Sequence, residues 1–193
     1  PPEFDSTEEY IEHIINDMLP AVARAKKARY CDVFCDRGVF SAEEAKGLLK
    51  KAVALGMGAK IHADEIENIG ATQVASELRA ASADHLVMST DEDIEAMIKA
   101  GVTGVLLPAT PYSLMSQHYA RARDMIDMGL PVALATDLNP NCWTENMQFI
   151  IQLSCFNMGL TPAEALTAAT FNAACAIKKE KTIGSIEKGK QAD

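Results

Sequence analysis

The sequence is poor in positive charge and contains no long apolar run. Its 193 residues include 18 Lys and Arg against 27 Asp and Glu, a formal net charge of −9. Because proteins bind the phosphate backbone through clustered Lys and Arg, this balance excludes a nucleic-acid partner. There is no run of about 18 apolar residues, and the N-terminus lacks the charged-then-apolar pattern of a signal peptide. We therefore expect neither a membrane span nor a secretory leader.

The chain also lacks any pattern of paired cysteines. Its five cysteines are scattered through apolar segments, and no second Cys/His pair follows Cys31 and Cys35 at zinc-ribbon spacing. We interpret these two as core residues. Such usage suits a reducing compartment, so we expect a cytoplasmic protein. The chain begins at Pro1 without a methionine, which indicates a piece of something longer.

Strand and helix patterns alternate along the whole chain after an N-terminal helix that Pro20 should kink or split. The strands are short and continuously apolar, which is typical of a parallel sheet covered by helices. Capping signals and apolar periodicity predict the following elements. Strands are expected over 31–35, 59–62, 84–87, 102–107 and 131–136, and helices over 6–28, 42–55, 69–81, 90–99, 119–128, 146–158 and 162–176.

Two architectures fit this alternation: an open doubly wound sheet or part of a (β/α)8 barrel. No Gly-rich phosphate loop follows any strand, which removes the main support for nucleotide binding in an open sheet. A barrel gathers its active site at the carboxyl ends of its strands. His62, His85 and Asp137 each stand at or near such an end. The α/β pattern therefore favours a partial (β/α)8 barrel.

The stretch from Ile61 to Glu65 (IHADE) concentrates the polar chemistry of the chain. His62 is followed at once by carboxylates that could orient it or transfer protons. Asp137 ends an apolar run, where an ionised carboxylate is costly unless it is paired or bound to a metal. A histidine and an aspartate facing one another across a barrel mouth can be two ligands of Zn²⁺ or Fe²⁺. A catalytic site normally has at least three protein ligands, so either this site is incomplete or there is none.

Several segments in this order resemble one enzyme family. They are GAKIHADEI, SADHL, GVLLPATPYSL, PVALATDLNPN and the closing ALTAATFNAACAI with GSIEKGKQAD. Together they resemble the imidazolonepropionases, metal-dependent amidohydrolases of histidine breakdown. The resemblance covers essentially the whole chain, and HADE with ADHL and TDLNP in this order is its most specific part.

The resemblance implies a fold and a metal site. The family has a (β/α)8 barrel and a small β-rich domain made from both chain ends. Residues 1–193 would then form a single domain holding barrel strands four to eight, with the earlier strands and the small domain absent. His62 and Asp137 match metal ligands of one divalent ion, Zn²⁺ or Fe²⁺. The family's first-strand His-x-His pair is absent here, as are its early-strand arginine and tyrosines.

The resemblance also implies catalytic and substrate-binding residues. Glu65 and His85 match catalytic residues, beside Asp137, and Glu65 also contacts the substrate ring. Asn139 lies in the loop that helps to hold the substrate, together with Asn141 and Cys142. Many relatives have Gly followed by Ser or Thr at these last two positions, so the substrate contacts there are expected to differ.

The activity implied is hydrolysis of the cyclic amide of 4-imidazolone-5-propanoate to N-formimino-L-glutamate by a homodimer acting on this small molecule. Two alternatives stay open. One is another amidohydrolase, such as a nucleobase deaminase or a dihydroorotase-like enzyme, with the same ligands and different loops. The other is an inactive fragment, because five strands cannot close an eight-stranded barrel.

Overall fold

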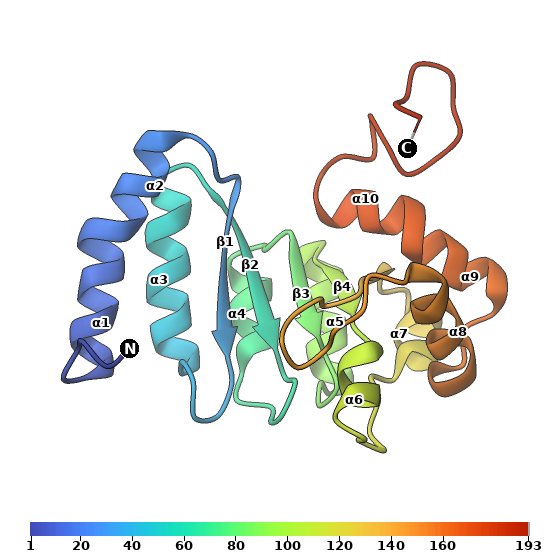
Figure 1. Ribbon diagram of the computed structural model, residues 1–193, viewed down its shortest axis with the longest axis horizontal. Helices are drawn as coiled ribbons and strands as arrows, with labels where there is room; N and C mark the ends of the chain where they lie inside the picture. Colours follow the sequence, from blue (N-terminus) through green and yellow to red (C-terminus); the bar gives the residue numbers. More distant parts are fainter. Residues whose placement is uncertain (193) are drawn as a thin grey trace.

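The computed structural model describes residues 1–192 and is built around one parallel five-stranded sheet (Figure 1). The strands pair in chain order, so each lies beside the next one along the sequence. They are β1 (Tyr30–Cys35), β2 (Gly58–Ala63), β3 (Ser82–His85), β4 (Thr103–Leu106) and β5 (Val132–Leu134). The predicted parallel sheet is confirmed. Asp193, the last residue of the predicted domain, lies outside the described residues.

The connections between strands are helical. The N-terminal segment comprises α1 (Thr7–His13), the π-turn η1 (Ile14–Met18) and α2 (Leu19–Ala25). The connecting helices are α3 (Ala42–Ala54), α4 (Ala71–Glu77), α5 (Asp91–Ala100), α6 (Ala109–Ser113) and α7 (Ala122–Met128). The last strand is followed by α8 (Met147–Met158), α9 (Pro162–Thr167), the π-turn η2 (Ala168–Asn172) and α10 (Ala173–Ala176).

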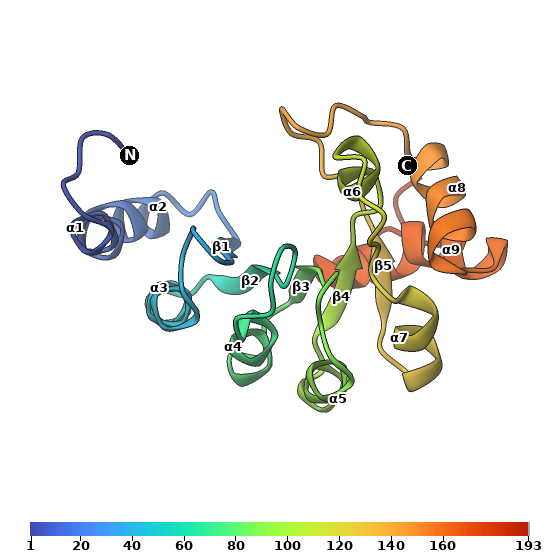
Figure 2. The ribbon, with the colours of Figure 1, turned by 90° about the horizontal axis from the view of Figure 1, so that it is seen from below.

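The order of the strands distinguishes the two candidate architectures. A doubly wound sheet reverses its strand order at a switch point, whereas a barrel adds each strand beside the preceding one. Here the order is strictly sequential. Figure 2, which looks toward the carboxyl ends of the strands, shows a curved sheet with α3, α4, α5 and α7 in a row along one side. This arrangement is an arc of a (β/α)8 barrel.

The two faces of the sheet differ in chemistry because successive side chains of a strand point to opposite faces. In β2, Ala59, Ile61 and Ala63 are buried in the main apolar cluster with residues of α3 and α4. Lys60 and His62 alternate with them and are only partly buried. The apolar set thus fixes which face of β2 carries the polar side chains.

Helix starts follow the predicted capping signals in most cases. Complete capping boxes open α3 at Ser41, α5 at Thr90 and α9 at Thr161. At α1, Ser6 accepts from the Glu9 amide as expected, but the Glu9 side chain accepts from the Asp5 amide instead of from Ser6. That first cap is therefore only half of a capping box.

Several predicted boundaries differ from the structure. The strand expected over 84–87 is Ser82–His85, because His85 and Leu86 adopt φ values of +77° and +59°, which end extended pairing. The helix expected over 69–81 spans only Ala71–Glu77, and α6 was not predicted at all. Ahead of Pro20 the backbone forms η1, where a wider turn accommodates the missing amide hydrogen. Within residues 1–192, no helix is long and apolar enough to cross a membrane.

Helices α7 and α9 are joined by a bidentate ion pair that should make stability depend on pH. Arg123 Nη1 donates to both carboxylate oxygens of Glu164, at 3.0 and 2.9 Å. The Arg123 hydrogen bonds, followed by those of Thr161, lower the pKa of Glu164 to about 2. A carboxylate with a depressed pKa stabilises the fold above its unfolded pKa, and this contribution is lost as pH falls through the folded value.

We expect Glu164→Gln to lower the thermal midpoint of the chain at pH 7. The difference from the wild type should shrink as pH falls from 4.5 toward 2, because the wild-type carboxyl is then protonated as well. Thermal melts at closely spaced pH values measure this. Glu12→Gln on the exposed side of α1 is the matched control, and a pH-independent effect of Glu164→Gln would contradict the assignment.

Candidate metal centre

Three side chains from three strand ends meet at the carboxyl edge of the sheet. His62 is the penultimate residue of β2, His85 is the last residue of β3, and Asp137 lies three residues beyond β5. One ligand atom from each lies within 4.8 Å of the other two. The two imidazole rings have centroids 5.2 Å apart. The structure thus brings together residues that the sequence pattern singled out separately.

The backbone is strained at the same positions. His85 has φ +77°, and Asp64 and Asp137 both have φ +54°. The left-handed region costs a non-glycine residue roughly 1 kcal/mol or more, and such residues concentrate at functional sites. The strain turns the backbone sharply where β2, β3 and β5 end, which aims the polar side chains at the edge of the sheet.

His62 is surrounded by carboxylates on the open face of the sheet. Its Nδ1 atom lies 2.9 Å from Oδ2 of Asp32, which makes an ion pair with the protonated imidazole. Burial lowers the pKa of His62, yet Asp32, with smaller contributions from Asp84 and Asp137, outweighs burial and raises it above its ordinary value. The position therefore favours positive charge.

Unlike His62, His85 lies in surroundings that favour its neutral imidazole. Its side chain is 2% exposed, and burial, followed by the nearby His62, lowers its pKa well below the ordinary value. A neutral imidazole can coordinate a metal or accept a proton. Its Nε2 atom lies 3.5 Å from Oε2 of Glu65, whose own pKa is raised by burial and by the charge of Asp137. Glu65 is thereby suited to carry a proton near the rings.

Asp137 is oriented by a hydroxyl from the helix after β4. Thr110 Oγ1 donates to Asp137 Oδ2 at 2.5 Å, and Thr110 is itself buried. The side-chain amide of Asn139 donates from Nδ2 to the Asp137 carbonyl oxygen at 2.8 Å and so shapes the loop that follows. Asn141 is exposed, while Cys142 is fully buried with its thiol 3.5 Å from the Thr136 carbonyl. The predicted substrate roles of these loop residues stay predictions.

The open face of the sheet carries further polar side chains next to His62. Ser82 Oγ donates to Asp84 Oδ1 at 2.6 Å, and Lys60 Nζ lies 3.7 Å from the same oxygen. Burial raises the pKa of Asp84, while Lys60 and Ser82 oppose the shift. Asp32, His62 and Asp84 form a second group whose ligand atoms lie within 4.8 Å of one another. Lys60 already supplies a cation to this second group. We therefore regard the first group, His62, His85 and Asp137, called the edge group below, as the better metal site.

The edge group fits a divalent metal. Two imidazoles and one carboxylate are the donors that zinc and iron sites use. The carboxylates of Asp32, Asp84 and Asp137 around His62 favour a cation at this edge. Sequence reasoning predicted His62 and Asp137 as ligands and placed His85 as a catalytic residue. It missed Asp32 and Thr110, although Asp32 is the only charged residue in CDVFC and alternates onto the polar face.

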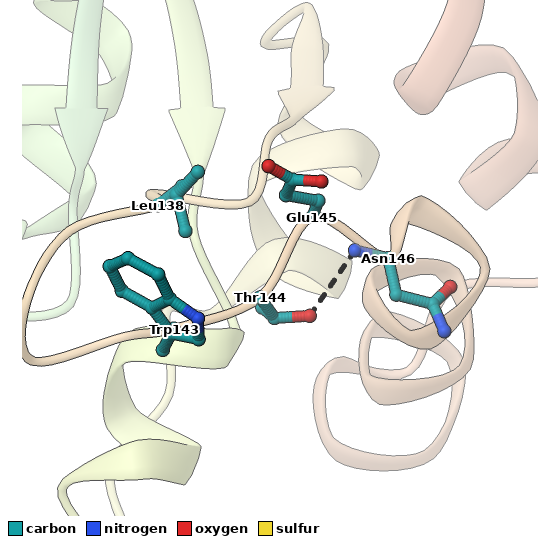
Figure 3. Close-up of a pocket in the computed structure, with 5 residues that line it drawn as sticks. All are labelled: Leu138, Trp143, Thr144, Glu145 and Asn146. Carbon is teal, nitrogen blue, oxygen red and sulfur yellow. Dashed lines mark hydrogen bonds between the residues drawn. The ribbon is translucent and has the colours of Figure 1, made fainter.

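A cavity of about 470 Å³ lies beside this centre, in the loop between β5 and α8 (Figure 3). It is lined by Leu138, Trp143, Thr144, Glu145 and Asn146. Thr144 Oγ1 accepts from the backbone amide of Asn146 at 3.2 Å, so two of the lining residues are hydrogen-bonded to each other. None of the polar strand-end residues lines the cavity. It therefore adjoins the centre and does not contain it.

A sequential parallel sheet with ligand-type side chains at its carboxyl edge is typical of metal-dependent barrel enzymes. The sequence profile of the amidohydrolase family matches residues 8–193. The chain therefore belongs to the amidohydrolase family.

Its curated relatives are longer proteins. The imidazolonepropionase of Streptococcus gordonii (strain Challis) is 51% identical over 195 residues, which cover 100% of this chain and 46% of that protein. The imidazolonepropionase of Streptococcus sanguinis (strain SK36) is similar to the same extent. The chain thus spans about half the length of these relatives.

Solved structures share the fold at low identity. An adenosine deaminase from Xanthomonas campestris with bound zinc has a TM-score of 0.76 at 20% identity, over 97% of this chain and 47% of that one. A Xaa-Pro dipeptidase with bound methionine has a TM-score of 0.75 at 19% identity, over 100% and 57% of the two chains. These matches confirm the predicted fold class, a partial (β/α)8 barrel.

We expect Thr110→Val to weaken divalent metal binding about 10- to 100-fold, because groups that orient a ligating carboxylate contribute on this scale. Thr110→Ser keeps the hydroxyl that donates to Asp137 and should bind metal as the wild type does. Competition titrations with zinc and a chromophoric chelator measure both affinities. Equal affinity of the Val and Ser variants would contradict the role of this hydrogen bond.

Proposed function

We propose that the protein containing this chain hydrolyses the cyclic amide of 4-imidazolone-5-propanoate to N-formimino-L-glutamate. The observation that carries the proposal is the convergence of His62, His85, Glu65 and Asp137 at one edge of the sheet. It is supported by 51% identity, along the whole chain, to proteins named imidazolonepropionase.

The chemistry divides among the four side chains. His62 and Asp137 are the residues that would hold one divalent ion, Zn²⁺ or Fe²⁺. When bound, the ion lowers the pKa of a water molecule and polarises the ring carbonyl. His85, held neutral by burial, and Asp137 accept the proton released as water adds to the carbonyl carbon.

Glu65 acts at the nitrogen end of the C–N bond that is cleaved. Its raised pKa allows it to carry a proton to the ring nitrogen as the bond between that nitrogen and the carbonyl carbon breaks. The single ring-opened product then contains one added water, with the hydroxyl on the carbonyl carbon and the hydrogen on the nitrogen. Asn139, Asn141 and Cys142 belong to the loop that we propose contacts the substrate.

The proposal extends to the arrangement of the whole protein. Residues 1–193 supply barrel strands four to eight, and the His-x-His pair of the first strand supplies the remaining ligands. The protein acts in the cytoplasm as a homodimer. For the 193 residues alone we propose no turnover, because β1 and β5 are the edges of an open sheet within the described residues, and two ligands, His62 and Asp137, leave the metal centre incomplete.

Asp137→Ala in the complete protein should abolish ring opening, with a loss of at least about 1,000-fold, since the variant lacks both a ligand and a proton acceptor. Chromatographic detection of the substrate and of N-formimino-L-glutamate measures this. Asp17→Asn, an exposed change on the N-terminal helical segment, is the control that should retain activity.

Substantial ring opening by Asp137→Ala would refute its role. The same assay run with nucleobases and with dihydroorotate separates the proposal from its nearest rivals. Turnover of one of those compounds, with none of 4-imidazolone-5-propanoate, would replace the proposed substrate with another amidohydrolase substrate.

A further inference from the structure

A buried carboxylate with no role in the proposed chemistry lies at the carboxyl end of β1. Asp36 is the first residue after this strand and is 1% exposed. Leaving a buried carboxylate without partners would cost several kcal/mol, so its contacts must offset that cost.

All the hydrogen bonds to the Asp36 carboxylate come from backbone amides. Oδ1 accepts from the amides of Arg37 at 2.7 Å and Glu67 at 3.1 Å, and Oδ2 accepts from the amide of Ile66 at 2.9 Å. Charge-assisted bonds of this kind are about twice as strong as neutral ones. Two of the three cross from the loop after β1 to the loop after β2, 30 and 31 residues further along the chain.

The loop after β2 carries Glu65 directly before the two amides that Asp36 holds. On the other side of Glu65, the Asp64 carboxylate accepts from the hydroxyls of Thr72 and Ser89, at 3.1 and 2.8 Å. The backbone is therefore fixed on both sides of Glu65. With the backbone fixed, the Glu65 side chain reaches Nε2 of His85 at 3.5 Å.

We propose that Asp36 is a positioning residue for Glu65: its carboxylate fixes the backbone after Glu65 and so holds the Glu65 carboxylate against His85. This inference rests on the proposed function, in which Glu65 carries the proton to the leaving nitrogen. Displacing a catalytic group by about 1 Å can cost a factor of about 100 in rate. On this inference the loss of rate in an Asp36 variant depends on Glu65, and that dependence makes the inference testable.

An exposed ion pair joins the same two loops and provides a matched control. Arg37 Nη1 lies 2.7 Å from Glu67 Oε1, with side chains 69% and 40% exposed. Exposed pairs contribute little to stability. Glu67→Gln removes this charge pair but keeps the Glu67 amide on Asp36, so it should leave the rate unchanged.

The test is a double-mutant cycle in the complete, metal-loaded protein, with 4-imidazolone-5-propanoate as substrate. Asp36→Asn presents an amide group toward one of the donors and should lower kcat about 10- to 100-fold with little change in KM. In a Glu65→Gln background, Asp36→Asn should cost less than about twofold, because the group it positions is already disabled. Asp36→Glu, which keeps the charge but shifts it by one methylene, serves as the second variant if Asp36→Asn does not fold.

Two kinetic results would overturn the inference. One is an Asp36→Asn variant with wild-type kcat. The other is a full loss of rate on adding Asp36→Asn to Glu65→Gln, which would mean that Asp36 supports the fold in general and not Glu65 in particular.

Amide hydrogen exchange on the complete protein tests the same contacts without turnover. Asp36→Asn should speed exchange at the amides of Ile66 and Glu67, while the Asp93 amide capped by Thr90 keeps its wild-type rate. Unchanged exchange at Ile66 and Glu67 overturns the inference. If the wild-type complete protein fails to open the ring, the proposed function is wrong, and the exchange result alone then decides whether Asp36 holds this loop.

Discussion

The register of the parallel sheet is the constraint on which the candidate site depends. Ala63 of β2 lies opposite His85 of β3, so the two strands end together and their imidazoles emerge at the same edge. A slip of one residue in β2 would turn His62 toward the helices and Ile61 toward the open face. The burial of Ile61 against the helix layer therefore determines where His62 points. Packing on one face of the sheet places the chemistry on the other.

Charge is the second determinant of the site. Burial, followed by the charge of Asp137, raises the pKa of Glu65. Against the effect of burial, Asp32, Asp84 and Asp137 raise the pKa of His62. An environment that favours a proton on His62 also favours other cations there, because both relieve the same excess of negative charge. His85 is deeper and is influenced first by burial, so two identical side chains 5.2 Å apart have opposite pKa shifts. That asymmetry separates a metal-binding position from a proton-accepting one.

Local sequence patterns predicted the sheet, most helix starts and the three strand-end residues. Each of these signals, an apolar run or a capping box, is contained within a few consecutive residues. They did not predict contacts that cross between units. Thr110 meets Asp137 from 27 residues away, and Asp36 meets Ile66 from 30 residues away. Nor did they predict the early end of β3, since His85 and Leu86 adopt positive φ without the glycine that usually signals it. Neither periodicity nor composition carries that information.

The acidic residues of this edge differ in what completes their hydrogen bonding. Asp93 accepts from Thr90, Asn68 and Gln73, and Asp36 accepts from three backbone amides. A carboxylate satisfied in this way is committed to holding loops, and its lone pairs are unavailable to a ligand. Within residues 1–192, Glu65 has only its 3.5 Å contact with His85, and Asp137 accepts a single hydroxyl. Incomplete hydrogen bonding thus marks the carboxylates that are free to bind metal or substrate, while the satisfied ones fix the loops that present them.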